Sequence, residues 1–123
     1  MHSAKRIMIV EDEAIMVMYL EMMLKREGFT IVCSVCTGED AIKMVEEIRP
    51  DVILMDIRLA GYLDGIETAS EIGKRFQCAI IFITGYLDQS NRQRAEELRP
   101  VAFLSKPLIT KELVAILDTL SVA

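Results

Sequence analysis

Short apolar runs alternate along the chain with longer segments in which apolar residues recur every three or four positions. The short runs are rich in β-branched residues and are typical of interior strands, whereas the longer segments have the period of amphipathic helices. A regular alternation of strand and helix favours one parallel sheet with helices packed on both of its faces. We therefore predict a doubly wound α/β fold whose strands are residues 6–10, 29–36, 52–55, 79–84 and 101–105.

Helices are predicted between and after these strands, and local signals mark some of their ends. Gly28 is expected to close the first helix as a C-cap, and Pro50 ends the second. Thr37 and Asp40 have the spacing of a capping box at the start of the second helix, and Thr110 is expected to cap the last one. The helical segments are residues 13–27, 37–50, 66–76, 88–98 and 110–120.

Two of these helices differ in how their apolar side chains are distributed. The segment that begins at Asp88 has only Ala95 and Leu98 as apolar anchors, so we expect it to be the most loosely held helix. The first helix is rich in methionine, which we interpret as core filling, with a binding surface as the alternative. These methionines are Met16, Met18, Met22 and Met23.

The length of 123 residues with 52% hydrophobic content suits one compact domain, residues 1–123, with one hydrophobic core. No run approaches the roughly 18 apolar residues of a membrane span, and no secretory signal is evident, so we expect a cytoplasmic protein without membrane contact. The net charge of −5 argues against direct contact with nucleic acid, whose phosphates are bound mainly by Lys and Arg. The sequence does not distinguish a complete protein from a fragment of a longer one.

The three cysteines are expected to be reduced thiols, because an odd number without an export signal does not suggest a disulfide framework. Cys33 and Cys36 form a C-x-x-C pair, which raises the alternatives of redox chemistry or metal binding. They lie in a predicted strand, where a spacing of three places two side chains on opposite faces. A zinc site is not indicated either, since the only histidine is His2 near the N-terminus.

Polar residues gather where the predicted strands end. Three acids, residues 11–13, follow the first strand, and Asp56 follows the third. Thr84 ends the fourth strand, and Lys106 and Pro107 follow the fifth. The carboxyl ends of parallel strands lie along one edge of the sheet, where α/β proteins bind ligands, so these side chains are expected to share one site.

Carboxylates that lie close together repel one another, and such a cluster either binds protons or recruits a cation. Oxygen ligands alone favour a hard ion, and Mg²⁺ fits best because it takes one or two carboxylates, retains water and accepts phosphate oxygens. Beside this ion a carboxylate can act as a nucleophile toward a phosphoryl group, while a lysine neutralises charge and a threonine hydroxyl binds an oxygen. The expected product is a phosphorylated aspartate.

Four pieces of sequence at these strand ends resemble the receiver domains of two-component response regulators. They are IMIVEDE, ILMDIRL, FIT and FLSKP, and they occur in the order and at the strand ends typical of that family. Each piece is weak alone, but together they are specific, and the resemblance covers essentially the whole chain. It implies a flavodoxin-like fold with strand order 2-1-3-4-5.

The resemblance also implies a role for each site residue. Asp56 is the expected phosphoacceptor, Thr84 contacts the phosphoryl group, and Lys106 pairs with it. The peptide bond from Lys106 to Pro107 is expected to be cis, as it usually is in the family. The implied metal ligands are Asp12 directly, Glu11 nearby or through water, Asp56, and the backbone carbonyl of Arg58.

In this family phosphorylation adds about two negative charges and changes the pose of one surface. The resemblance places Phe103 as the aromatic residue that rotates when Thr84 moves, and a partner reads the surface of the fourth helix, fifth strand and fifth helix. It implies a histidine kinase or phosphotransfer protein as the donor and a downstream protein or effector domain as the output. Pairing of the phosphorylated domain with itself stays open, as do the identities of the kinase, its signal and the output partner.

Some positions depart from the usual pattern of the family. The loop after the phosphoacceptor has Ala60 where a proline is frequent, and one residue more than usual before Asp64. Gly85 stands where alanine or serine is commoner beside the site threonine. The lifetime of the phosphoryl group depends on two positions in this family, which are occupied here by Arg58 and Tyr86. Neither that lifetime nor the path of residues 57–65 follows from the sequence.

Two other functions remain to be distinguished. A haloacid-dehalogenase-like phosphatase also uses an aspartate nucleophile, but it needs a second acid two residues later, where this chain has Arg58. A degenerate receiver would be a phosphorylation-independent docking module, and the presence of Asp56, Thr84 and Lys106 counts against it. Each polar residue alone also has a structural explanation, such as complementing a helix dipole. These explanations do not account for the position of all of these residues at the same end of the sheet. We therefore expect a phosphoacceptor signalling domain, which assists its own phosphotransfer and dephosphorylation, rather than an enzyme.

Overall fold

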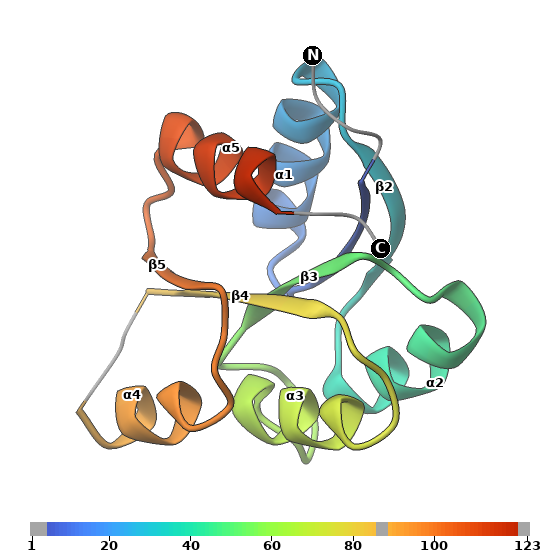
Figure 1. The fold of residues 1–123 in the computed structure, drawn as a ribbon, viewed down its shortest axis with the longest axis vertical. Helices are drawn as coiled ribbons and strands as arrows, with labels where there is room; N and C mark the ends of the chain where they lie inside the picture. Colours follow the sequence, from blue (N-terminus) through green and yellow to red (C-terminus); the bar gives the residue numbers. More distant parts are fainter. Residues whose placement is uncertain (1–4, 86–88, 121–123) are drawn as a thin grey trace.

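A computed structural model of the chain describes residues 5–85 and 89–120. Its strands are β1 (Arg6–Val10), β2 (Thr30–Val35), β3 (Val52–Asp56), β4 (Ala79–Thr84) and β5 (Ala102–Ser105). Its helices are α1 (Ala14–Arg26), α2 (Gly38–Ile48), α3 (Gly65–Gly73), α4 (Gln89–Glu96) and α5 (Thr110–Thr119). The strands of this described part form one parallel sheet in the order β2-β1-β3-β4-β5, as predicted (Figure 1).

Each strand limit lies within one residue of the prediction, and β3 extends to include Asp56 itself. The helix limits differ more, and α3 ends at Gly73 rather than at Phe76. Phe76 still packs against the core from the turn that follows, where its backbone N–H donates to the carbonyl of Ile72. Among residues 5–85 and 89–120, no helix has the length and apolar character that a membrane crossing needs.

Alternate side chains of the strands point to opposite faces of the sheet and build two apolar cores. On β1, Ile7 and Ile9 belong to the core with α1 and α5, whereas Met8 and Val10 belong to the core with α2, α3 and α4. Figure 1 shows the same division, with α1 and α5 on one side of the sheet and the other three helices opposite. β3 is buried along its whole length, which explains its uninterrupted apolar run.

The helix ends confirm Gly28 at the end of α1 and the Thr37 half of the predicted capping box of α2, and they correct a third prediction. Gly28 lies just beyond α1 with φ +92°, a left-handed conformation that glycine adopts after helix C-termini. The Thr37 side chain accepts a hydrogen bond from the Asp40 N–H at 3.1 Å and is the N-cap of α2. Thr110 is not the N-cap of α5, because Ile109 occupies that position. The Thr110 hydroxyl instead bonds a tyrosine hydroxyl of α1 at 3.1 Å.

The α4 helix is held even more weakly than predicted. Ala95 is fully buried, but Leu98 is 37% exposed and does not anchor the segment. Ala95 is therefore the only buried side chain of α4, and little apolar contact opposes a change in the pose of this helix. The predicted start of the helix at Asp88, and the predictions for His2 and Tyr86, fall outside the described residues.

The methionines of α1 divide between the core and the surface. Met23 is buried and Met16 is half-buried against the core, as core filling requires. Met18 and Met22 are 68% and 55% exposed, so the core interpretation is wrong for these two. Ile15 is also exposed, and this side of α1 therefore presents apolar side chains to solvent.

The three cysteines are free thiols in different surroundings. Cys33 is half-buried within β2, whereas Cys36 is exposed and lies beyond the end of that strand, rather than within it as predicted. Burial raises the pKa of Cys33, and it raises the pKa of Cys78 to about 11. Both of these thiols are therefore poor nucleophiles at neutral pH.

Candidate functional site

Four strands deliver polar side chains to one edge of the sheet. Asp56 is the last residue of β3 and Thr84 is the last residue of β4, and both are buried, with exposed fractions of 5% and 3%. Glu11 directly follows β1 and is 3% exposed, and Lys106 directly follows β5. The structure thus brings these side chains to the edge where the pattern of strand ends placed them.

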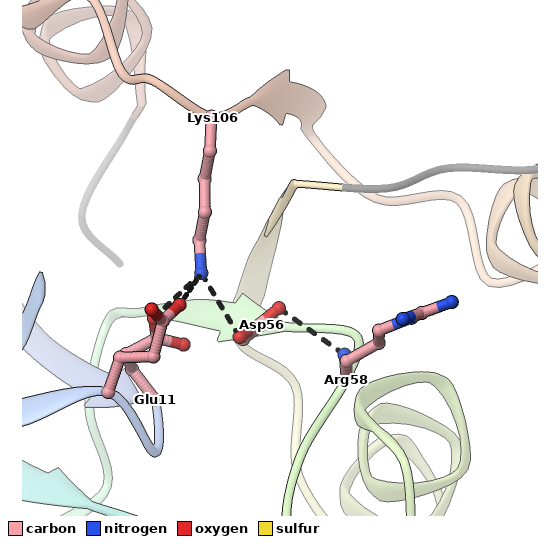
Figure 2. Close-up of polar contacts among 5 residues, drawn as sticks. Glu11, Asp56, Arg58 and Lys106 are labelled. Atoms are coloured by element: carbon pink, nitrogen blue, oxygen red, sulfur yellow. Dashed lines mark hydrogen bonds and ion pairs between the residues drawn. The ribbon is translucent and has the colours of Figure 1, made fainter.

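The Lys106 ammonium group lies at the centre of this site (Figure 2). Its Nζ donates to Glu11 Oε1 at 2.7 Å, to Glu13 Oε1 at 2.9 Å and to Asp56 Oδ2 at 3.2 Å. One cation therefore compensates three carboxylates, and the site retains excess negative charge. The sequence did not indicate the Glu13 contact, because an acid next to a helix N-terminus is also explained by the helix dipole.

Arg58 contributes its backbone to the site, while its side chain turns elsewhere. Its N–H donates to Asp56 Oδ1 at 3.3 Å. Figure 2 shows the guanidinium group pointing away from the Asp56 carboxylate. The two oxygens of Asp56 therefore have different partners, an ammonium group for one and a backbone N–H for the other.

The acidic side chains form a group that suits a cation. Carboxylate oxygens of Glu11, Asp12 and Asp56 lie within 4.8 Å of one another. Asp12 is exposed and lines a cleft of about 330 Å³, whose wall also includes Thr84 and Gly85. Glu11 Oε2 is buried and has no hydrogen-bond partner among the described residues, which is costly for a carboxylate oxygen. A hard divalent ion such as Mg²⁺ prefers such oxygens, so the residues present fit this ion.

Comparison with known proteins gives a match over nearly all of the described structure. The family model of the response regulator receiver domain matches residues 7–118. The chain belongs to this family.

Several solved structures resemble this receiver domain. The signal receiver domain of a modulated diguanylate cyclase from Desulfovibrio desulfuricans is 33% identical with a TM-score of 0.90, and the match covers 94% of this chain and 92% of that one. The response regulator domain of CheB from Thermotoga maritima is 25% identical with a TM-score of 0.86, and the match covers 94% of each chain. A chain of the CheX-CheY-BeF3-Mg²⁺ complex from Borrelia burgdorferi shares the fold, with 23% identity, a TM-score of 0.83 and coverage of 91% and 85%.

Two further features expected from the family can be located in this receiver domain. The peptide bond between Lys106 and Pro107 is cis, as predicted. Phe103 on β5 is half-buried, and its ring stacks on that of Phe82 with the centroids 5.5 Å apart. The guanidinium carbon of Arg92 on α4 lies 5.5 Å from the centroid of the Phe103 ring. This aromatic side chain therefore contacts both the core and the weakly held α4 helix.

The protonation states of the site reflect its excess of carboxylates. Burial and the neighbouring Asp56 carboxylate raise the pKa of Glu11 to about 8, although the Lys106 ammonium opposes this. Burial by itself would lower the pKa of Lys106, but its hydrogen bonds to Glu11 and Glu13 raise this pKa above the usual range. Without a bound cation, the site therefore favours a charged Lys106 and a Glu11 that keeps its proton to a higher pH than an exposed glutamate does.

We predict that Glu11 makes the metal-free receiver domain lose stability as the pH rises from about 4.5 to about 8. The folded state keeps the Glu11 proton in this window while the unfolded chain releases it, so the free energy of unfolding falls. The loss amounts to a few kcal/mol, at about 1.4 kcal/mol per unit of pKa. The raised pKa of Lys106 changes the free energy of unfolding only above pH 10.5, the ordinary pKa of a lysine, and so has no effect between pH 4.5 and 8.

Urea denaturation in the presence of EDTA, at several pH values across this window, measures the effect. The wild type is compared with Glu11→Gln, which has a similar shape and cannot titrate at this position. As the pH rises, the free energy of unfolding of the wild type should fall relative to that of Glu11→Gln. A difference that does not vary with pH would contradict the raised pKa.

Proposed function

We propose that this receiver domain accepts a phosphoryl group on Asp56 in a reaction that depends on Mg²⁺. One observation carries the proposal. The Lys106 Nζ atom lies 3.2 Å from Asp56 Oδ2, and carboxylate oxygens of Glu11 and Asp12 lie within 4.8 Å of an Asp56 oxygen. A nucleophile, a fixed cation and a site for a divalent ion are thus grouped at one edge of the sheet. Membership of the receiver family supports the same assignment.

The side chains present account for the chemistry. A carboxylate oxygen of Asp56 attacks the phosphorus atom of the donor, and the bond to the leaving group breaks with its electron pair as the new P–O bond forms. The Lys106 ammonium binds one oxygen of the transferred group, and the hydroxyl of Thr84 binds another. Bound Mg²⁺ supplies further neutralisation of the phosphoryl charge. This ion would be held by Asp12, Asp56 and the backbone carbonyl of Arg58, with Glu11 beside it or bound through water.

The donor and the output of the reaction are assigned from the family. The donor is a histidine kinase or a phosphotransfer protein, and the output is a downstream protein or an effector domain. The adduct adds about two negative charges beside Thr84. When Thr84 moves toward the adduct, Phe103 rotates into the vacated space and leaves its contact with Arg92. The surface of α4, β5 and α5 then changes, because Ala95 alone anchors α4 in the core.

The two alternatives are tested by the fate of a small phosphodonor. A phosphatase is not favoured, because Arg58 stands where the second acid is needed and its side chain points away from the site (Figure 2). A docking module would have the same fold and differ only in its failure to take up phosphate. Uptake of a phosphoryl group is therefore the measurement that distinguishes a receiver from a phosphatase and from a docking module.

Intact mass spectrometry after incubation with acetyl phosphate tests the proposal, with Mg²⁺ in one sample and EDTA in the other. The proposed function predicts a single acid-stable, base-labile phosphoryl group with Mg²⁺ and almost none with EDTA. Sustained turnover of the donor without an adduct would instead indicate a phosphatase. If the protein neither gains the group nor consumes the donor, the docking module would be the correct function.

A further inference from the structure

The loop of residues 57–64 joins the end of β3 to the start of α3 and carries the backbone of Arg58 beside Asp56. At its base, the Gly65 N–H donates to the carbonyl of Ile57 at 2.7 Å. The Ile57 side chain is buried, so the loop is fixed at this end. Of the positions that follow, Leu59 is half-buried and packs against the core, whereas Arg58, Ala60, Gly61 and Tyr62 are exposed and are not fixed by burial of their side chains.

The far part of the loop is held by a side chain from another element, Glu39 in the first turn of α2. Its Oε1 atom accepts the backbone N–H groups of Tyr62 and Leu63, each at 3.0 Å. Gly61 precedes them with φ +98°, and a Cβ atom at this position would lie 2.7 Å from Glu39 Oε2. Successive N–H groups beside a left-handed residue form a concave site for an anion, and here the carboxylate of the same chain fills it.

The electrostatics keep this carboxylate in its charged form. Hydrogen bonds from its own backbone N–H, and from the N–H groups of Leu63 and Tyr62, hold the pKa of Glu39 below its usual value. A position in the first turn of α2 favours a negative charge for the same reason, because the N–H groups there point toward it. An isolated bridge between Thr37 and Ala60 places the start of α2 against the same loop.

We propose that Glu39 is a positioning residue for the reaction at Asp56. Its carboxylate anchors Tyr62 and Leu63, and together with the Thr37–Ala60 bridge it fixes the path of the loop beyond Arg58. The backbone of Arg58 is thereby held in one conformation, with its N–H bonded to Asp56 and its carbonyl group placed to bind the metal. The proposal rests on the proposed function of Asp56, but the anchoring itself is a property of the metal-free protein.

Two variants and a control test the anchor. Glu39→Ala removes the acceptor, whereas Glu39→Gln keeps an oxygen that can accept from both N–H groups. Glu46→Ala changes an exposed acid on the same helix and serves as the control. In the metal-free protein, hydrogen exchange of the Tyr62 and Leu63 amides should become about ten-fold faster in Glu39→Ala, and much less so in Glu39→Gln.

The consequence at the metal is measured by titration calorimetry with Mg²⁺. Partners of metal ligands typically change affinity by about 10- to 100-fold when removed, and we expect the lower end, about ten-fold weaker binding in Glu39→Ala. Phosphoryl uptake from acetyl phosphate should slow by a similar factor. Glu39→Gln should restore most of both properties, and Glu46→Ala should match the wild type. Gly61→Ala disturbs the same contact from the loop, because its Cβ atom would lie 2.7 Å from Glu39 Oε2. It should therefore also accelerate exchange of the Tyr62 and Leu63 amides.

The results separate this inference from the proposed function. If the wild type takes up phosphate but Glu39→Ala binds Mg²⁺ and reacts as the wild type does, the positioning role is wrong. Unchanged amide exchange in both Glu39→Ala and Gly61→Ala would show that no anchor exists. If the wild type takes up no phosphate, the proposed function fails, while amide exchange still decides whether Glu39 holds the loop.

Discussion

Asp56→Asn is expected to abolish the uptake of a phosphoryl group from acetyl phosphate in the presence of Mg²⁺, while the fold is retained. The amide has almost the shape of the carboxylate and its oxygen can still accept the Arg58 N–H, but it is not a nucleophile toward phosphorus. Lys106 also keeps its hydrogen bonds to Glu11 and Glu13. Intact mass measures the loss, and thermal unfolding checks the fold.

Asp51→Asn is a matched control for this variant. Asp51 precedes the same strand at its opposite end, where its Oδ2 atom accepts the Arg6 N–H at 2.8 Å. An asparagine there also keeps an oxygen acceptor, so this variant should take up phosphate as the wild type does. A base-labile phosphoryl group on Asp56→Asn would show that another residue is the acceptor.

Lys106→Met is expected to destabilise the metal-free protein and to strengthen the binding of Mg²⁺. Methionine fills similar space but leaves Glu11 and Asp56, which are nearly buried, without their shared cation. Breaking such a pair lowers the free energy of unfolding by about 3–5 kcal/mol at a pH where both acids are ionised. Mg²⁺ no longer competes with an ammonium group, so its affinity should rise about ten-fold.

Urea denaturation with EDTA measures the first effect, and titration calorimetry with Mg²⁺ measures the second. Lys111→Met, which removes an exposed lysine from α5, should change neither property appreciably. Weaker Mg²⁺ binding in Lys106→Met would mean that the ammonium does not compete with a cation at the acidic group.

The hydrophobic pattern was sufficient to place the five strands and to predict a parallel sheet, whereas the strand order came from the resemblance to the receiver family. β3 is buried throughout, and its first four residues, Val52 to Met55, form a continuous apolar run. The residues at the site could also be placed, since the end of a parallel strand fixes an edge of the sheet without any knowledge of the loops. Asp56, Thr84 and Lys106 are all of this kind.

The α1 helix shows why burial could not be predicted for each side chain. Met16, Leu20 and Met23 form one apolar stripe at helical spacing and face the core. Ile15, Met18 and Met22 form a second stripe that is exposed. Both stripes have the same period, and the period does not tell which one faces the sheet.

The features that the sequence did not reveal depend on contacts between separate segments. Glu39 holds the loop after Asp56 only because the fold brings α2 beside it, and nothing local to Glu39 indicates this. The capping box at the start of α3 has a local signal, because Asp64 and Glu67 have the spacing that it requires. Asp64 also accepts a hydrogen bond from Arg94 of α4 at 3.3 Å, which only the fold could show.

The central claim is that Asp56, within the acidic group beside Lys106, is the residue that carries the phosphoryl group. Reduction of the phosphorylated protein with borohydride converts an aspartyl phosphate to homoserine, and peptide mass mapping then locates it. We predict homoserine at position 56 alone, in the sample incubated with Mg²⁺ and not in the sample with EDTA. Homoserine at Asp12 or elsewhere, or its appearance without Mg²⁺, would contradict the account.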